Sequence, residues 1–143
     1  MAESQKKILI VEDSADSRDL VVLCLKRAGY DISIAGDGHE ALEKAAAVHP
    51  DLILMDISMP GMDGLEATVR LKSDPLTRDI PVVVTTAHAY KTMIDRATQV
   101  GATEVLVKPL DFLALGEKLG RLIRAQENTL SAAKPPQSNS REL

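Results

Sequence analysis

Five short aliphatic runs, spaced fairly evenly along the 143 residues, constrain the fold more than any other feature of this sequence. The runs are Ile8–Val11, Ile32–Ala35, Leu52–Met55, Val82–Val84 and Val105–Val107. Four of them are unbroken, which is typical of strands buried on both faces of a parallel sheet. The second run alternates between apolar and polar residues and therefore suits the edge of such a sheet.

Segments in which apolar residues recur with helical spacing separate and follow the runs. The first segment ends at Gly29 and the fourth at Gly101, positions typical of glycines that cap helix C-termini. The second segment covers residues 37–48 and the third residues 65–71. The apolar stripes of the first, fourth and fifth segments consist of Leu20, Val21, Cys24, Leu25 and Ala28, of Met93, Ala97 and Val100, and of Leu115, Leu119, Leu122 and Ile123.

A strand followed by a helix, repeated five times, predicts an α/β fold with a five-stranded parallel sheet covered on both faces. Right-handed crossover connections leave few topologies for such a chain. The doubly wound order 2-1-3-4-5 fits best, because it places the alternating run at an edge.

Composition excludes several classes of function. Tyr30, Tyr90 and Phe112 are the three aromatic residues, and there is no tryptophan, so platforms for stacking nucleic-acid bases are missing. The net charge of −4 also lacks the positive surface that grips phosphate backbones. We therefore expect no nucleic-acid partner.

Cysteine usage and hydropathy indicate a cytoplasmic setting. Cys24 is the single cysteine, which excludes an internal disulfide or a thiolate metal cluster, and its apolar neighbours predict a small buried side chain. Apolar stretches stay shorter than the roughly 20 residues that span a bilayer. The N-terminus does not have the pattern of a signal peptide. We expect no membrane contact.

Charged and hydroxyl side chains follow four of the runs, at the edge of the sheet where the carboxyl ends of parallel strands meet. Glu12 and Asp13 follow the first run, and Asp56 follows the third. Thr86 comes after the fourth run and Lys108 after the fifth. Each residue alone has an ordinary explanation as a helix cap or a solvated side chain. Their joint placement at one edge predicts a functional site.

The charges at this edge favour phosphoryl chemistry with a divalent cation. Clustered carboxylates repel one another unless a cation neutralises them, and Lys108 offsets one charge. Mg²⁺ suits the remaining excess, because it takes oxygen ligands from one or two carboxylates and a phosphate. A carboxylate beside such an ion can attack phosphorus and form an aspartyl phosphate. Lys108 and Thr86 would then contact the phosphoryl oxygens.

Four motifs in chain order resemble the receiver domain of bacterial two-component response regulators. ILIVEDS carries Glu12 and Asp13, and LILMDISMPGMDGLE carries Asp56 at the position of the phosphoacceptor. VVVTTAHA carries Thr86 at the switch hydroxyl, and GATEVLVKPLD carries Lys108 before a proline. The resemblance implies the flavodoxin-like receiver fold with strand order 2-1-3-4-5.

By resemblance, Asp56 accepts a phosphoryl group from a phosphohistidine on a histidine kinase or a histidine phosphotransfer protein. Asp13, Asp56 and the main-chain carbonyl of Ser58 would ligate Mg²⁺ directly, and Glu12 would act through water. Such a domain catalyses only its own phosphorylation and its slow dephosphorylation, and is not otherwise an enzyme. Its phosphorylation would switch protein–protein interactions with a downstream target.

The resemblance also assigns residues around the phosphoryl group. The Lys108–Pro109 bond is expected to be cis. Ala87 is small, as the approach to the phosphoryl group requires, and Ser58 and His88 occupy the two positions that tune hydrolysis. The family normally places an aromatic residue three positions before the lysine, where this chain has Val105. Tyr90 is a candidate to replace that ring.

The resemblance divides the chain into three parts. Residues 1–6 form an N-terminal extension, residues 7–126 the receiver domain, and residues 127–143 a polar, proline-containing tail that we expect to be disordered. The chain continues for 18 residues beyond Ala125, so we expect a stand-alone receiver without an output domain. The exposed side of the first helix, near Arg18 and Val22, is a possible docking surface for the histidine donor; a merely solvated face is equally compatible with the sequence.

Three other functions fit the same topology less well. A phosphatase with an aspartyl-phosphate intermediate wants a second acid two residues after the nucleophile, where Ser58 stands. A receiver-like interaction domain that needs no phosphorylation should lack part of the acidic pocket. A flavin-binding domain wants aromatic and hydroxyl-rich loops, which this chain lacks.

Overall fold

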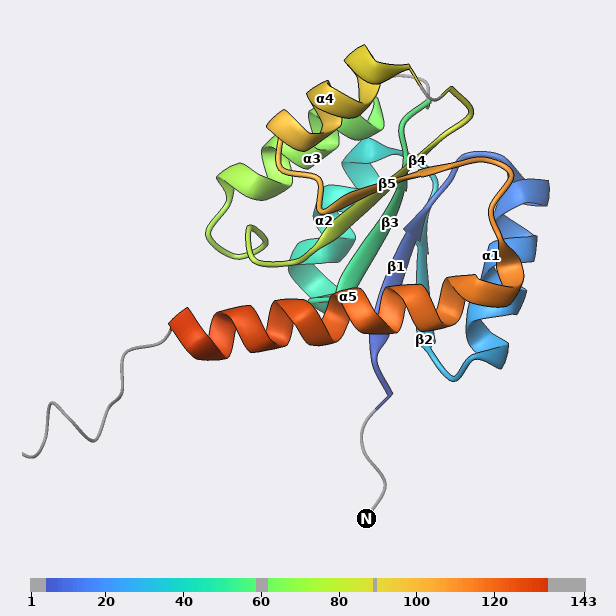
Figure 1. Ribbon diagram of the computed structural model, residues 1–143, viewed down its shortest axis with the longest axis horizontal. Coiled ribbons are helices and arrows are strands. Elements are labelled where there is room, and N and C mark those ends of the chain that lie inside the picture. Colours follow the sequence, from blue (N-terminus) through green and yellow to red (C-terminus); the bar gives the residue numbers. More distant parts are fainter. Residues whose placement is uncertain (1–4, 59–61, 89, 134–143) are drawn as a thin grey trace, which may run out of the picture.

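Five parallel strands form one sheet in the order β2-β1-β3-β4-β5 (Figure 1). A computed structural model describes residues 5–58, 62–88 and 90–133 of the chain. The strands are β1 (Lys7–Val11), β2 (Asp31–Ala35), β3 (Leu52–Asp56), β4 (Val82–Thr86) and β5 (Glu104–Val107). The predicted fold class and strand order are confirmed, and β2, the alternating run, lies at an edge.

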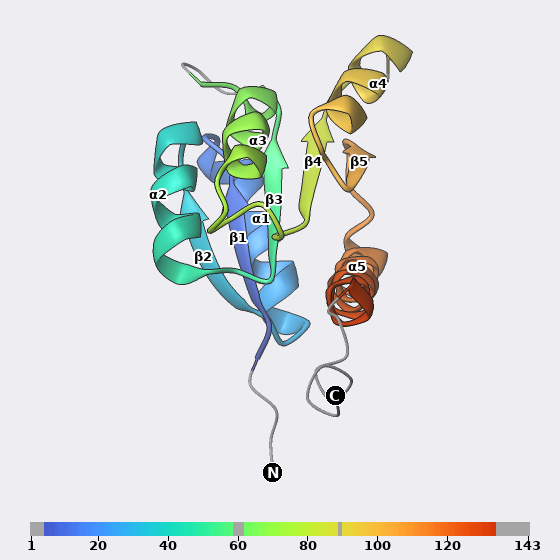
Figure 2. The same ribbon diagram turned by 90° about the vertical axis from the view of Figure 1, so that its left-hand side faces the viewer.

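Five helices follow the strands and cover both faces of the sheet. They are α1 (Ala15–Arg27), α2 (Gly38–Val48), α3 (Gly64–Ser73), α4 (Lys91–Gln99) and α5 (Phe112–Ala133). Figure 2 shows α2 and α3 side by side on one face, and α1 and α5 pack against each other on the opposite face. Gly29 and Gly101 have φ angles of +98° and +105°, as the predicted helix ends require.

The core consists of two aliphatic layers, because alternate residues of each strand face opposite sides of the sheet. Leu9, Ile53 and Val84 belong to the layer beneath α2, α3 and α4. Ile8 and Leu54 belong to the layer beneath α1 and α5. The central strands β1, β3 and β4 are thereby buried on both faces, and their carboxyl ends are held in register at one edge of the sheet.

The apolar stripe of α1 is narrower than predicted. Val21 and Leu25 are buried, but 57 % of Leu20 is exposed and Ala28 is also exposed. Cys24 is half-buried rather than buried, and its thiol donates a hydrogen bond to the Phe112 carbonyl (3.1 Å). The five-residue apolar stripe is wider than the face of α1 that the sheet and α5 cover, so Leu20 and Ala28 at its margin are exposed.

The strand β5 was expected to be buried on both faces, and this expectation is wrong. It forms the second edge of the sheet, Val105 and Leu106 are half-buried, and 41 % of Val107 is exposed. A strand with one neighbour is covered less completely than a central one. A three-residue apolar run does not distinguish these two situations.

The last helix continues beyond the predicted end of the domain. Residues 127–133, expected to be disordered, belong to α5. The Glu127 carboxylate pairs with the Lys6 ammonium (2.6 Å), and the Gln126 amide donates to the Asp79 carbonyl (2.7 Å). These contacts, and the absence of proline between Phe112 and position 135, allow the helix to extend. Residues 134–143 of the expected tail lie outside the described part of the chain.

Candidate functional site

The structure brings together the acidic residues that the sequence analysis singled out. Glu12 and Asp13 lie directly after β1, and Asp56 is the last residue of β3. One carboxylate oxygen from each lies within 4.8 Å of the others. Glu12 and Asp56 are buried, whereas Asp13 is exposed. Two buried carboxyl groups and one exposed carboxyl group therefore meet at the carboxyl end of the sheet.

Lys108 provides the positive charge in this cluster. Its ammonium nitrogen lies 3.4 Å from a Glu12 oxygen and 3.6 Å from an Asp56 oxygen. Burial, followed by the hydrogen bond with Asp56 and its negative charge, raises the pKa of Glu12 to about 7, although Lys108 acts in the opposite direction. One ammonium thus does not compensate the carboxylates fully. The uncompensated oxygen donors fit Mg²⁺, which prefers carboxylate ligands.

Glycine at position 64 allows α3 to begin directly beside Asp56. A Cβ atom at this position would lie 2.2 Å from the main-chain oxygen of Asp56. The Gly64 amide donates to the Ile57 carbonyl (3.0 Å), and the Ser58 amide donates to the Asp56 carboxylate (3.2 Å). The helix start therefore fixes the turn that carries Asp56. Residues 59–61 of the same motif lie outside the described residues.

Thr86 and Lys108 are joined through the main chain at the ends of β4 and β5. The Lys108 amide donates to the Thr86 carbonyl (2.7 Å), and the Lys108–Pro109 bond is cis, as the resemblance implied. The Thr86 side chain is buried, and its hydroxyl donates to the His88 carbonyl (3.2 Å) and accepts from the His88 amide (3.0 Å). Ala87 and His88 are exposed.

Two further contacts at the site were not predicted. Arg18, expected on the exposed side of α1, is half-buried, and its guanidinium donates to the Glu12 carbonyl (3.1 Å). The close approach of Gly64 to Asp56 was also missed. An Asp-Gly pair seven residues after the acidic residue was the available signal, because Asp63 caps α3 by accepting from the Glu66 amide.

Comparison with known proteins agrees with this geometry. The model of the response regulator receiver domain family matches residues 8–120. The chain belongs to this family. Response regulator PleD of Caulobacter vibrioides is 40 % identical over 118 residues, which cover 82 % of this chain and 26 % of PleD. The transcriptional regulator RpaA of Synechocystis is 35 % identical over 128 residues, which cover 90 % of this chain and 53 % of RpaA. The chain thus spans about half the length of such relatives, or less.

Solved receiver structures share the fold. The chemotaxis protein CheY4 of Vibrio cholerae has 34 % sequence identity and a TM-score of 0.78, and the match covers 82 % of this chain and 98 % of CheY4. The receiver domain of the sensor histidine kinase PA1611 from Pseudomonas aeruginosa has 30 % identity and a TM-score of 0.78, over 84 % of this chain and 98 % of that domain. That structure has a magnesium ion coordinated in its active-site cleft.

Family membership establishes a receiver domain with a phosphoryl-accepting role in two-component signalling. Receiver domains bind Mg²⁺ at an acidic pocket, and the cluster of Glu12, Asp13 and Asp56 has the matching composition. Within the described residues, every helix is too short or too polar to cross a membrane.

We predict that Gly64→Ala destabilises the domain and weakens Mg²⁺ binding. The added methyl group would collide with the Asp56 main chain, so the turn carrying the carboxylate has to shift. We expect a loss of about 2 kcal/mol in the free energy of unfolding, measured by urea denaturation. Gly36→Ala is the matched control, because a Cβ there meets a single side-chain oxygen at 3.8 Å. Equal stability of the two variants would contradict this interpretation.

We also predict that Mg²⁺ binding weakens as the pH falls below 7. Protonated Glu12 carries no charge to attract the cation, so the apparent affinity should fall about fivefold between pH 7 and pH 6. In the metal-free domain, protonation of Glu12 stabilises the fold, whereas it weakens the binding of Mg²⁺. The folded state holds this proton more tightly than the unfolded chain, so Glu12 contributes stability below pH 4.5 that is lost as the pH rises through about 7.

Isothermal titration of Mg²⁺ in buffers of different ionisation enthalpy measures both the affinity and the proton released. Glu12→Gln is the control, since it has no carboxyl group to titrate and should bind Mg²⁺ with a flatter pH profile. An affinity of the unsubstituted protein that is constant from pH 5.5 to 8 would sink the prediction.

Proposed function

We propose that Asp56 accepts a phosphoryl group from the phosphohistidine of a histidine kinase or phosphotransfer protein, and that this event switches protein–protein interactions. The observation that carries the proposal is the buried Asp56 carboxylate, 3.6 Å from the Lys108 ammonium and grouped with Glu12 and Asp13. The chain would catalyse only its own phosphorylation and slow dephosphorylation. A cytoplasmic location is part of the proposal and is supported by the single free cysteine.

In the proposed transfer, an Asp56 oxygen forms a bond to phosphorus while the bond between phosphorus and the donor histidine nitrogen breaks. The Lys108 ammonium lies where it can pair with a phosphoryl oxygen, and the Thr86 hydroxyl would donate a hydrogen bond to another. Bound Mg²⁺, held by Asp13, Asp56 and the Ser58 carbonyl with Glu12 acting through water, would neutralise charge between the carboxylate and the phosphoryl oxygens.

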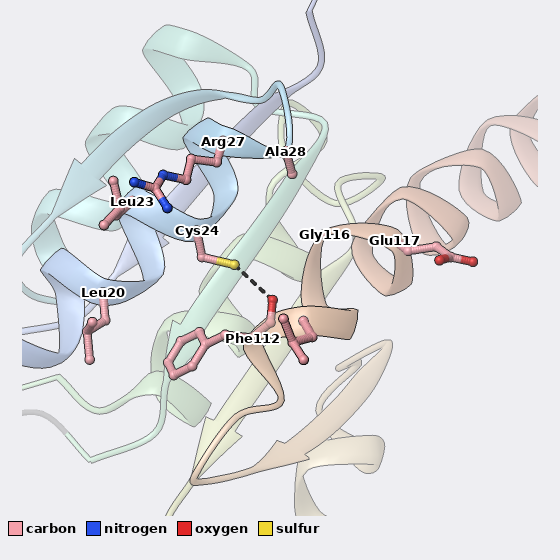
Figure 3. A pocket seen from close by; sticks show the side chains of 9 residues that line it. Leu20, Leu23, Cys24, Arg27, Ala28, Phe112, Gly116 and Glu117 are labelled. Atoms are coloured by element: carbon pink, nitrogen blue, oxygen red, sulfur yellow. Dashed lines mark hydrogen bonds between the residues drawn. The ribbon is translucent and has the colours of Figure 1, made fainter.

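A groove between α1 and α5 offers a surface for the histidine donor (Figure 3). Leu20, Leu23 and Phe112 line this groove of about 490 Å³, and Leu113 beside them is fully exposed. The Cys24 thiol and the Phe112 carbonyl join the two helices beneath it. The exposed side chains of Leu20, Leu23 and Leu113 give this groove an apolar lining that a protein partner would cover.

This groove continues toward the phosphorylation site. A second depression shares Leu20 and Phe112 with the groove and reaches Lys108 and Pro109. A helix lying in the groove would therefore have one end near Lys108. We place the helix that carries the donor histidine there. The apolar part of the surface centres on Leu20 and Leu23, whereas the previously suggested Arg18 and Val22 are half-buried.

Phosphorylation of Asp56 is tested with acetyl phosphate and Mg²⁺ followed by intact-mass spectrometry. The wild-type chain should gain about 80 Da, one HPO₃ group. Asp56→Asn should show no adduct, because an amide oxygen does not displace the donor. Asp19→Asn, which alters an exposed carboxylate on α1, should be modified like the wild type. An adduct that persists in Asp56→Asn would assign the acceptor to another residue.

The docking surface is tested by Leu23→Glu, which places a charge in the groove without disturbing the core. Phosphotransfer should fall about tenfold with the purified kinase or phosphotransfer protein that phosphorylates the wild type. The rate with acetyl phosphate should not change, because this small donor needs no docking. Leu76→Glu is the control: 62 % of Leu76 is exposed, and it lies before β4, at the opposite end of the sheet. Equal rates for both variants with the protein donor would refute the assignment.

A further inference from the structure

The Thr86 hydroxyl has one hydrogen, and in this structure the His88 main chain occupies it. The hydroxyl donates to the His88 carbonyl (3.2 Å) and accepts from the His88 amide (3.0 Å). The proposed function requires the same hydrogen to be donated to a phosphoryl oxygen. Because Thr86 is 1 % exposed, water does not compete freely for its hydroxyl. The His88 carbonyl and the phosphoryl group are thus alternative acceptors for one hydrogen.

The His88 side chain stacks on the ring of Tyr90. The ring centroids are 5.7 Å apart and the ring planes differ by 10°. This is a contact between two of the few rings in the chain, and 66 % of Tyr90 is nevertheless exposed. Parallel rings at this separation attract each other. The stack therefore restrains the His88 main chain, which holds the Thr86 hydroxyl.

Besides the stack, the described contacts of Tyr90 include a main-chain hydrogen bond, in which its carbonyl accepts from the Ile94 amide (3.0 Å). Tyr90 is the N-cap residue of α4 and makes no side-chain capping hydrogen bond, and the first turn of α4 contains no acidic residue. Within α4, Ala97 is the one buried residue. Val105 supplies no ring from β5. The His88–Tyr90 stack is consequently a side-chain contact that ties His88 to the start of α4.

We propose that Tyr90 is a positioning residue for Thr86: its ring holds His88 where the His88 carbonyl keeps the hydroxyl from the phosphoryl group. This inference rests on the proposed function. When the hydroxyl turns to a phosphoryl oxygen, one hydrogen bond replaces another, and the exposed His88 main chain becomes hydrated. The stack thus favours the unphosphorylated arrangement, and its removal shifts the equilibrium toward the phosphorylated one.

The test compares Tyr90→Ala with Tyr90→Phe. The alanine variant loses the stack, whereas phenylalanine keeps a ring and removes only the hydroxyl. Phosphorylation by acetyl phosphate with Mg²⁺ should be about threefold faster in Tyr90→Ala and unchanged in Tyr90→Phe. His88→Ala also removes the stack, so it should act in the same direction as Tyr90→Ala. The double variant should add nothing further.

A spectroscopic readout separates positioning from a general structural effect. The amide resonances of Thr86 and His88 are followed in ¹H–¹⁵N spectra of the wild type, free and with Mg²⁺ and beryllofluoride, a phosphoryl mimic. In Tyr90→Ala the resonances of the free protein should move along the line from the first state to the second. In Tyr90→Phe they should stay at the wild-type position.

The outcomes distinguish this inference from the proposed function. If wild-type Asp56 forms no adduct, the proposed function fails and the inference falls with it. If the wild type is phosphorylated while Tyr90→Ala keeps both its rate and its resonance positions, the inference alone is overturned. Equal effects of Tyr90→Ala and Tyr90→Phe, or additive effects of the two alanine substitutions, would also overturn it.

Discussion

Two buried carboxylates compete for one ammonium at the carboxyl end of the sheet, and the rest of the site depends on this imbalance. Glu12 and Asp56 each lie less than 4 Å from the Lys108 nitrogen, in a place where water screens them poorly. A folded domain tolerates such excess charge only if a proton, a cation or both neutralise it. The raised pKa of Glu12 shows the first solution, and the acidic cluster fits the second.

The sheet topology produces this charge density with short, rigid connections. β1 and β3 are neighbours although 40 residues lie between the end of β1 at Val11 and the start of β3 at Leu52, and β4 lies on the other side of β3. Their side chains are buried on both faces, so the positions of Asp56 and Thr86 are set by the aliphatic core rather than by flexible loops. Gly64 extends the same principle, because its missing side chain lets a helix start support the Asp56 turn. The stability of the core and the geometry of the site are therefore linked.

The strands and the cluster at their ends could be predicted because unbroken aliphatic runs in a parallel sheet leave little choice of position for the residues that follow. How much of each helix surface is covered by neighbouring elements, and where the last helix ends, could not be predicted. Leu20 continues the apolar stripe of α1 but lies outside the face that packs on the sheet, since helical spacing does not define how wide the buried face is. Likewise, α5 extends through residues 127–133, where tertiary contacts of Gln126 and Glu127 outweigh a polar composition.

Side-chain contacts with main-chain groups were the least predictable part of the site. The bonds from Arg18 to the Glu12 carbonyl and from Thr86 to the His88 main chain join residues whose types have many other possible partners. The spacing of motifs predicts which residues meet at the edge of a sheet, but not which acceptor each hydrogen-bond donor binds. The pairing of Thr86 with His88 became visible only in three dimensions.

Two hydrogen bonds at Thr86 bear on how the proposed phosphorylation of Asp56 would be transmitted. The Thr86 carbonyl accepts from the Lys108 amide (2.7 Å), so β4 remains attached to the start of the cis Lys108–Pro109 turn. The hydroxyl, by contrast, is bonded to the main chain of His88, an exposed residue. Rotation of the hydroxyl toward Asp56 leaves the first bond intact and breaks the second. On the proposed function, the response would be directed along the chain toward α4, and its cost would depend on the stack of His88 on Tyr90.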